Sequence, residues 1–215
     1  SIGRPYGGGS FSVSLEGEIS YTLTSPYHPA DIGYYEGNSF KRLTNLNNDL
    51  LRGKDLGVIE EIWYNSSVDG RKIQGWIAKP PGFDKEKKYP LIVENHGGPI
   101  SNYGDRFSPE ILLYSAAGYV VFYPNPRGST SYGEEFGNLL YRNYPGDDYH
   151  DVMDGVDKML ELGYIDMENL FVTGGSAGGI MTAWIIGKTD RFKASAVIKP
   201  VMNWISKTLV ADNYY

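Results

Sequence analysis

A serine set among glycines, between an apolar run and a helical pattern, constrains this chain more than any other feature. Thr173-Gly174-Gly175-Ser176-Ala177-Gly178-Gly179 follows the apolar run Leu170–Thr173 and opens a helical pattern from Ala177 to Gly187. This arrangement predicts a strand, a strained turn and a helix, with the serine at the turn. Side chains two residues before and after Ser176 would collide with neighbouring backbone, so small residues there leave its Oγ clear.

This turn makes Ser176 a candidate nucleophile. The N-terminus of the following helix places a positive dipole end where negative charge develops in acyl transfer. The alternative is a glycine-rich turn that binds phosphate or only packs. The strand, turn and helix occur in the order that the nucleophile requires, which favours the nucleophile over that alternative.

A second pattern, Glu94-Asn95-His96-Gly97-Gly98-Pro99, follows the apolar run Leu91–Val93. Alone it would be a simple turn after a strand. Placed before a serine turn, it predicts an oxyanion loop, in which two backbone N–H groups face a carbonyl oxygen as it becomes negative. Gly97 and Ala177 are the expected pair of donors. We expect His96 to organise the loop rather than act as the base, because a base must reach Ser176 from the opposite side.

The pattern of short apolar runs alternating with helical segments predicts an α/β fold with a mostly parallel sheet flanked by helices. A helix from about Asp148 to Gly163 should place one apolar face on the sheet. Residues 1–55 instead show short alternating runs typical of antiparallel strands. The expected strands are Phe11–Leu15, Ile19–Thr24, Leu91–Val93, Tyr119–Tyr123, Leu170–Thr173 and Ala194–Ile198, with a hairpin formed by Val58–Tyr64 and Lys72–Ala78 and a helix over Ile111–Ala117.

Composition excludes several function classes. The formal charge of -6 argues against a nucleic-acid or anionic-membrane partner. No apolar stretch is long enough to span a membrane, so we expect a soluble chain. The three histidines are scattered and cysteine is absent, so the sequence predicts neither a metal site nor another cofactor. The lack of cysteine fits the cytoplasm and the periplasm equally well.

Arg127 lies in a third pattern, Asn125-Pro126-Arg127-Gly128-Ser129, after the strand Tyr119–Tyr123. It could hold a substrate carboxylate. The favoured interpretation is a structural ion pair that fixes this loop beneath the serine turn.

Together, H-G-G-P, N-P-R-G-S and G-G-S-A-G-G resemble the prolyl oligopeptidase family of serine peptidases, within it the acylaminoacyl-peptidase and dipeptidyl-peptidase branch. The resemblance is clear over residues 55–215 and weaker before them. It implies that residues 1–55 are the end of a β-propeller-like region. Residues 56–215 would then be the N-terminal part of an α/β-hydrolase catalytic domain whose C-terminal part is absent.

The resemblance also implies roles for individual residues. Ser176 would form the acyl-enzyme, and His96 and Gly97 would contribute to the oxyanion site. Val201 and Trp204 would wall the pocket for the residue before the cleaved bond, with plain core packing as the alternative. The expected substrate is a short peptide.

The chain departs from the family in one respect: no His follows Ser176, although the base follows the serine in this fold. Asp190 and Asp212 do not match the usual position of the triad acid. We therefore expect a truncated piece that is inactive alone and is completed by another chain or a missing segment. A carboxylesterase and a non-catalytic scaffold or interaction module remain as alternatives, and the sequence leaves the oligomeric state open.

Overall fold

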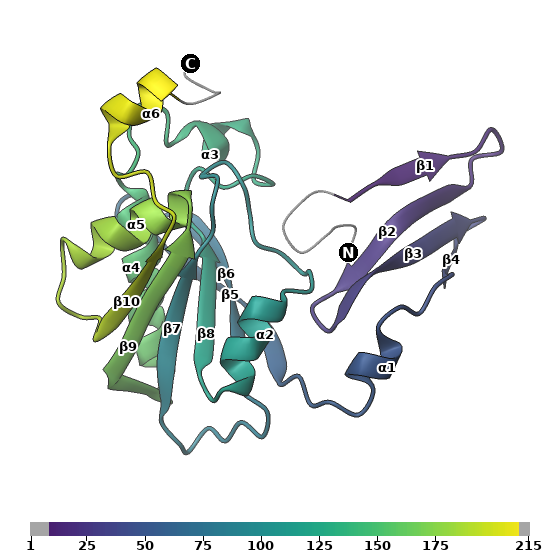
Figure 1. Ribbon diagram of the computed structural model, residues 1–215, viewed down its shortest axis with the longest axis horizontal. Coiled ribbons are helices and arrows are strands. Elements are labelled where there is room, and N and C mark those ends of the chain that lie inside the picture. The colour runs from purple at the N-terminus through teal and green to yellow at the C-terminus, as the bar shows by residue number, and fades with distance from the viewer. Residues whose placement is uncertain (1–8, 211–215) are drawn as a thin grey trace.

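The computed structural model describes residues 9–210, which form two β-sheets with helices around the second (Figure 1). The elements in chain order are β1 (Phe11–Val13), β2 (Ile19–Ser25), β3 (His28–Glu36), β4 (Ser39–Arg42), α1 (Asn48–Leu51), β5 (Val58–Asn65), β6 (Lys72–Lys79), β7 (Tyr89–Asn95), α2 (Pro109–Ala116), β8 (Val120–Asn125), α3 (Glu134–Asn138), α4 (Asp148–Glu161), β9 (Ile165–Gly175), α5 (Ala177–Ile186), β10 (Ala194–Ile198) and α6 (Trp204–Val210).

The first sheet is an antiparallel meander in the order β1-β2-β3-β4. Its strand number is that of one propeller blade. The sequence patterns predicted β1 and β2 but not β3, because Asp31 interrupts the apolar alternation. Asp31 is buried and accepts hydrogen bonds from Thr44 Oγ1 and the Leu46 N–H, at 2.8 and 2.9 Å. The antiparallel strands predicted for the start of the chain are therefore confirmed.

The second sheet has the order β10-β9-β7-β8-β6-β5. The pairs β10/β9, β9/β7 and β7/β8 are parallel, while β6 pairs antiparallel with both β8 and β5. The predicted β5–β6 hairpin is present, with Gly70 in the left-handed conformation in its turn. This mostly parallel sheet confirms the predicted partial α/β-hydrolase fold.

Helices cover both faces of the second sheet. On one face, α4 packs Val152, Val156 and Met159 against Val93 and Phe122 of the parallel strands, and α5 adds Met181 and Ile185. On the other face, Ile111 of α2 packs with Ile92 and Val121. Successive residues of β7 and β8 thus point into different layers, which explains why these strands are apolar without interruption.

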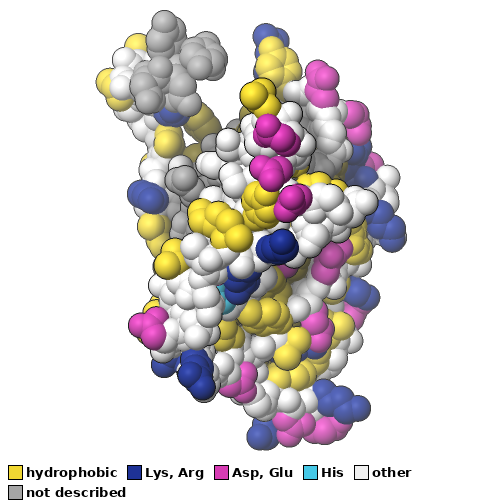
Figure 2. All heavy atoms as spheres, turned by 90° about the vertical axis from the view of Figure 1, so that its right-hand side faces the viewer, with side chains coloured by type: hydrophobic (Ala, Val, Ile, Leu, Met, Phe, Trp, Pro, Cys, Tyr) yellow, Lys and Arg dark blue, Asp and Glu magenta, His cyan; other side chains and the backbone are white. Residues whose placement is uncertain are grey.

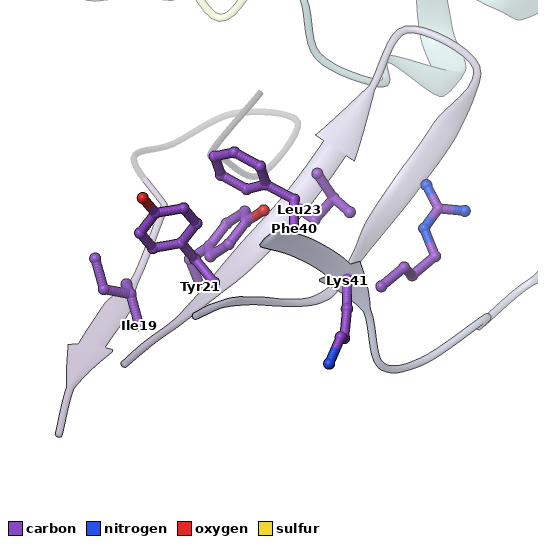
Figure 3. A pocket seen from close by; sticks show the side chains of 7 residues that line it. Ile19, Tyr21, Leu23, Phe40 and Lys41 are labelled. Carbon is purple, nitrogen blue, oxygen red and sulfur yellow. The ribbon is translucent and has the colours of Figure 1, made fainter. Parts of the chain in front are cut away.

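The first sheet leaves part of its apolar surface uncovered by the described residues. A hollow of about 600 Å³ is lined by the apolar side chains of Ile19, Tyr21, Leu23, Tyr35 and Phe40 (Figure 3). Viewed from the side of this sheet, the molecule shows hydrophobic side chains between charged ones (Figure 2). Completion by another chain or segment stays a prediction, as does the domain boundary at residues 55–56. No helix within residues 9–210 is long and apolar enough to cross a membrane.

Gly155 allows α4 to approach the sheet. A Cβ at this position would lie 2.5 Å from ring atoms of Phe122 and 2.7 Å from Tyr64 Oη. Phe122 is fully buried, and the Tyr64 hydroxyl donates to Asp151 O at 2.9 Å, so neither side chain has room to move. We predict that Gly155→Ala lowers the free energy of unfolding by roughly 1–3 kcal/mol, despite the higher helix propensity of alanine.

Gly137 in α3 provides the matched control, because a Cβ there would meet nothing within 4 Å. Gly137→Ala should leave stability unchanged or raise it slightly. Denaturant unfolding of the two variants tests the close packing; equal stabilities would contradict it.

Candidate active site

Ser176 stands at the junction of β9 and α5 in a strained conformation. Its φ and ψ are 60° and -118°, values that a residue with a side chain adopts rarely. Its side chain is exposed, and its N–H donates to Ile198 O at 3.0 Å. The structure therefore has the strained strand-to-helix turn that the sequence predicted, with Ser176 at its tip.

The glycines around Ser176 permit a close contact between the end of β7 and the start of α5. A Cβ at Gly178 would lie 1.9 Å from Asn95 O, and one at Gly174 would lie 2.6 Å from the same atom. Both contacts are with backbone, which cannot rotate away. The predicted collisions two residues before and after Ser176 are thus confirmed.

Asn95 joins the same two elements through its side chain. Its Nδ2 donates to Thr182 Oγ1 at 3.2 Å and to Thr173 O at 3.3 Å, and Thr182 Oγ1 donates to Gly178 O at 2.8 Å. Asn95 is buried, so these bonds replace those that its Nδ2 would make with water, whereas its Oδ1 has no hydrogen-bond partner among the described residues. The sequence pattern around His96 includes Asn95 but does not predict this role. The signal was a polar residue at the end of an apolar strand.

Gly97 lies directly against the serine turn. A Cβ at Gly97 would lie 3.1 Å from Gly175 O and 3.6 Å from Ser176 Cβ. Ala177 is the first residue of α5, so its N–H has no acceptor within the helix. The structure thus brings the Gly97 backbone close to Ser176, which directly precedes the first N–H of α5.

Both ring nitrogens of His96 already have partners. Nδ1 lies 2.8 Å from Gly97 O, and Nε2 lies 3.0 Å from Ser129 Oγ. Burial lowers the pKa of His96, and the nearby Arg106 lowers it further, while the contact with Gly97 O acts in the opposite direction. The ring is held within its loop, as the interpretation of His96 as a loop organiser expects.

A cleft of about 990 Å³ brings together Ser176, Gly97 and His96. Ala177 instead lines a much smaller cavity, to which His96 also contributes. Glu94 lies in the wall of the cleft and is buried, with Oε1 accepting from Tyr103 Oη at 3.4 Å and Oε2 unpartnered among the described residues. Burial, with a smaller effect of Glu110, raises the pKa of Glu94 to about 8.

The two expected pocket residues do not line this cleft. Trp204 is half exposed and stacks edge-on against Tyr144, with ring centroids 6.3 Å apart. The Tyr144 hydroxyl donates to Ala177 O at 2.7 Å, so Trp204 is one aromatic contact away from the serine turn. Val201 is partly buried. A pocket role for Val201 and Trp204 stays a prediction.

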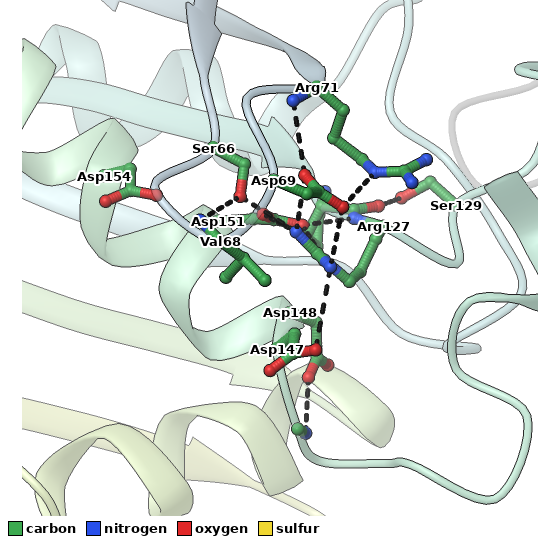
Figure 4. A network of polar contacts seen from close by, with 12 residues as sticks. Ser66, Val68, Asp69, Arg71, Arg127, Ser129, Asp147, Asp148, Asp151 and Asp154 are labelled. Carbon is green, nitrogen blue, oxygen red and sulfur yellow. Dashed lines mark hydrogen bonds and ion pairs between the residues drawn. The ribbon is translucent and has the colours of Figure 1, made fainter.

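Arg127 forms the structural ion pairs that the sequence favoured. Its Nε donates to Asp151 Oδ2 at 2.9 Å, and further carboxylates come from Asp69 and Asp147 at 3.4 and 3.7 Å. Figure 4 shows these acidic side chains turned toward the buried guanidinium. These ion pairs join α4 and the β5–β6 turn to the loop after β8, which carries Arg127. They thereby fix this loop, whose Ser129 contacts His96.

No cluster of three or more His, Asp or Glu side chains with metal-binding geometry occurs in the part of the chain from residue 9 to 210.

The sheet order and the serine turn together define an α/β-hydrolase. Comparison with known families makes the assignment more specific. The sequence profile of the prolyl oligopeptidase family matches residues 105–215, which include Ser176, and the chain belongs to this family. A profile described as acetyl xylan esterase matches residues 27–147 and ends before Ser176.

Individual proteins similar to this chain support the family assignment. The uncharacterized peptidase YuxL of Bacillus subtilis is 41% identical over 96% of this chain and 32% of its own length. Dipeptidyl-peptidase 5 of Schizosaccharomyces pombe is 38% identical over 96% of this chain and 30% of its own length. A solved structure, the acylaminoacyl peptidase of Pyrococcus horikoshii, superposes with a TM-score of 0.87 at 28% identity, covering 94% of this chain and 32% of that chain. The chain spans about a third of the length of these relatives.

The contact between Gly178 and Asn95 O leads to a prediction about stability. Gly178→Ala should lower the free energy of unfolding by more than the roughly 1–3 kcal/mol of ordinary overpacking, because backbone must move on both sides. Gly175→Ala is the control: its Cβ would meet only Lys199 Cε, at 3.6 Å. Thermal unfolding should separate the two variants, and a Gly178→Ala protein as stable as the Gly175→Ala protein would contradict the contact.

The raised pKa of Glu94 leads to a prediction about how stability depends on pH. Its pKa in the folded chain, about 8, lies above the ordinary value of 4.5, so the folded state holds this proton more tightly. The stability that the proton provides is complete below pH 4.5 and is lost as the pH rises toward 8. The free energy of unfolding of Glu94→Gln should therefore increasingly exceed that of the natural protein between pH 5 and 8, by on the order of 2–4 kcal/mol in all, and its unfolding temperature should rise relative to that of the natural protein. The exposed Glu86→Gln variant should show no such trend, and a constant difference for Glu94→Gln would contradict the assignment.

Proposed function

We propose that this chain carries the nucleophile and the oxyanion site of a serine peptidase that cleaves short peptides. In this proposal Ser176 Oγ attacks the carbonyl carbon of the peptide bond. The backbone N–H groups of Gly97 and Ala177 stabilise the negative oxygen of the tetrahedral intermediate. Collapse of the intermediate releases the amine and leaves an acyl-enzyme, which water then hydrolyses.

The observation that carries the proposal is an exposed serine held at a φ of 60° beside Gly97 in an open cleft. A strained non-glycine residue costs stability, so its retention indicates a function for the side chain. The helix behind it supplies one oxyanion donor without further adjustment.

His96 supports the loop and is not the base in this proposal, because both of its ring nitrogens contact other groups. We place the general base on a histidine contributed by another part of the full-length protein or by another chain. The chain without that base would be inactive or nearly so, because the oxyanion site and binding alone provide only residual catalysis.

The names of the relatives support peptides as substrates. Relatives named dipeptidyl-peptidase and acylaminoacyl peptidase align with almost the whole chain, including the serine turn. The choice between a dipeptidyl and an acylaminoacyl type remains open within the proposal.

A carboxylesterase is the second candidate, favoured by the acetyl xylan esterase profile over residues 27–147. The serine turn and oxyanion loop serve esters as well as amides. Hydrolysis of a short peptide amide by the full-length protein favours the peptidase; hydrolysis of acetyl esters alone favours the esterase.

Labelling by a fluorophosphonate followed by intact mass spectrometry tests the nucleophile. We predict one adduct on the full-length protein, none on Ser176→Ala, and a fall in kcat of roughly 10⁴- to 10⁶-fold for that variant. Ser131→Ala is the matched control, because Ser131 is exposed, lines the same cleft and also has a positive φ of 81°.

Ser131→Ala should label like the natural protein. An unlabelled full-length protein would instead support the non-catalytic scaffold, and labelling that survives Ser176→Ala would place the nucleophile elsewhere.

A further inference from the structure

Lys199, like Ser176, has a strained backbone in the candidate site. It follows β10 directly and has a φ of 41°, in the left-handed region that favours glycine. It also precedes Pro200, which ordinarily holds the preceding residue in an extended conformation. Two independent backbone preferences therefore oppose this conformation, and strain of this kind gathers at functional sites.

The position of Lys199 is coupled to that of Ser176. The carbonyl of Ile198, directly before Lys199, accepts the hydrogen bond from the Ser176 N–H at 3.0 Å. Lys199 Cε lies 3.6 Å from the point where a Cβ of Gly175 would be. Lys199, Gly175 and Ser176 line the same cleft. The ammonium group, one bond beyond Cε, is thus held next to the serine turn.

Within residues 9–210, the Lys199 side chain forms no ion pair with any carboxylate. Its positive charge is therefore not neutralised by a carboxylate in the part of the chain that the structure describes. Arg106, the other basic side chain of the cleft lining apart from His96, is partly buried and donates to Asn102 O at 2.5 Å. Two acidic residues also line the cleft, and neither forms an ion pair with Lys199: Glu110 accepts a hydrogen bond from Tyr114 Oη at 3.0 Å, and Glu94 has its pKa raised to about 8 and is mostly protonated at pH 7.

We propose that Lys199 binds a substrate carboxylate, so that the site prefers short peptides with Asp or Glu as the residue whose carbonyl Ser176 attacks; this inference rests on the proposed function. An ammonium beside the turn can reach a carboxylate on that residue. Lys199 is exposed, whereas a lysine base works when it is desolvated, so we assign it to binding. The chain is acidic as a whole, so a preference for acidic peptides would come from this local cation and not from net charge.

The test compares two substrates in the full-length protein, Ala-Glu and Ala-Gln linked to aminomethylcoumarin. We expect kcat/KM to be higher for Ala-Glu. Lys199→Met should lower kcat/KM for Ala-Glu about tenfold and leave Ala-Gln nearly unchanged. With a third substrate, Ala-Lys linked to aminomethylcoumarin, Lys199→Glu should reverse the preference, so that kcat/KM is higher for Ala-Lys than for Ala-Glu. High salt should weaken the preference of the natural protein for Ala-Glu.

Lys85→Met is the control, because it removes the same charge from an exposed position. Lys85 lies shortly before β7, whereas His96 follows the other end of that strand, so this variant should leave kcat/KM for both substrates unchanged. Equal losses for both substrates in Lys199→Met would show that Lys199 only supports the loop and would overturn the inference. So would a natural protein without preference for Ala-Glu.

Two further measurements separate this inference from the proposed function. Fluorophosphonate labelling of Lys199→Met reports on Ser176 alone and should persist. Calorimetric binding of Ala-Glu and Ala-Gln peptides to Ser176→Ala reports on Lys199 without turnover. Tighter binding of Ala-Glu, abolished by Lys199→Met, supports the inference even if labelling fails; equal binding overturns it even if labelling succeeds.

Discussion

The candidate site depends on one close contact, between the backbone carbonyl of Asn95 at the end of β7 and the start of α5 at Gly178. Parallel pairing places the end of β7 beside the end of β9, and the absence of a Cβ at Gly174 and Gly178 lets α5 begin against it. This contact aligns the proposed oxyanion loop, which follows β7, with the serine that follows β9. The fold and the candidate site thus have the same physical origin, and a change to the contact should alter both.

The side chains around Ser176 are of two kinds. Some make hydrogen bonds within the protein, and others are exposed to the cleft. Asn95 and Arg127 are buried, His96 is partly buried, and hydrogen bonds hold each of them, so these side chains keep loops in place. Ser176 and Lys199 are exposed and strained, and the rest of the site orients them toward the cleft. Structural groups are satisfied internally, whereas groups that meet a substrate keep their bonding capacity for it.

Sequence reasoning predicted the parts that depend on local pattern. The turn at Ser176, the amphipathic α4 and the β5–β6 hairpin each follow from residue spacing and turn chemistry. The role of Asn95 and the strain at Lys199 depend on partners that are distant in the sequence, Thr182 and Ser176, and no local pattern encodes them. β3 was not predicted for the same reason, since its buried Asp31 accepts hydrogen bonds from the segment after β4. The two pocket residues, Val201 and Trp204, came from resemblance alone, and their role stays a prediction.

The central claim is that the backbone of Gly97 and Ala177 forms an oxyanion site around Ser176. The most direct measurement is a crystal structure of the full-length protein after reaction with a phosphonate. We predict a phosphonyl oxygen about 2.7–3.1 Å from both the Gly97 and the Ala177 nitrogen, with the phosphorus bonded to Ser176 Oγ. A phosphonyl oxygen turned away from either nitrogen, or an adduct on another residue, would contradict it.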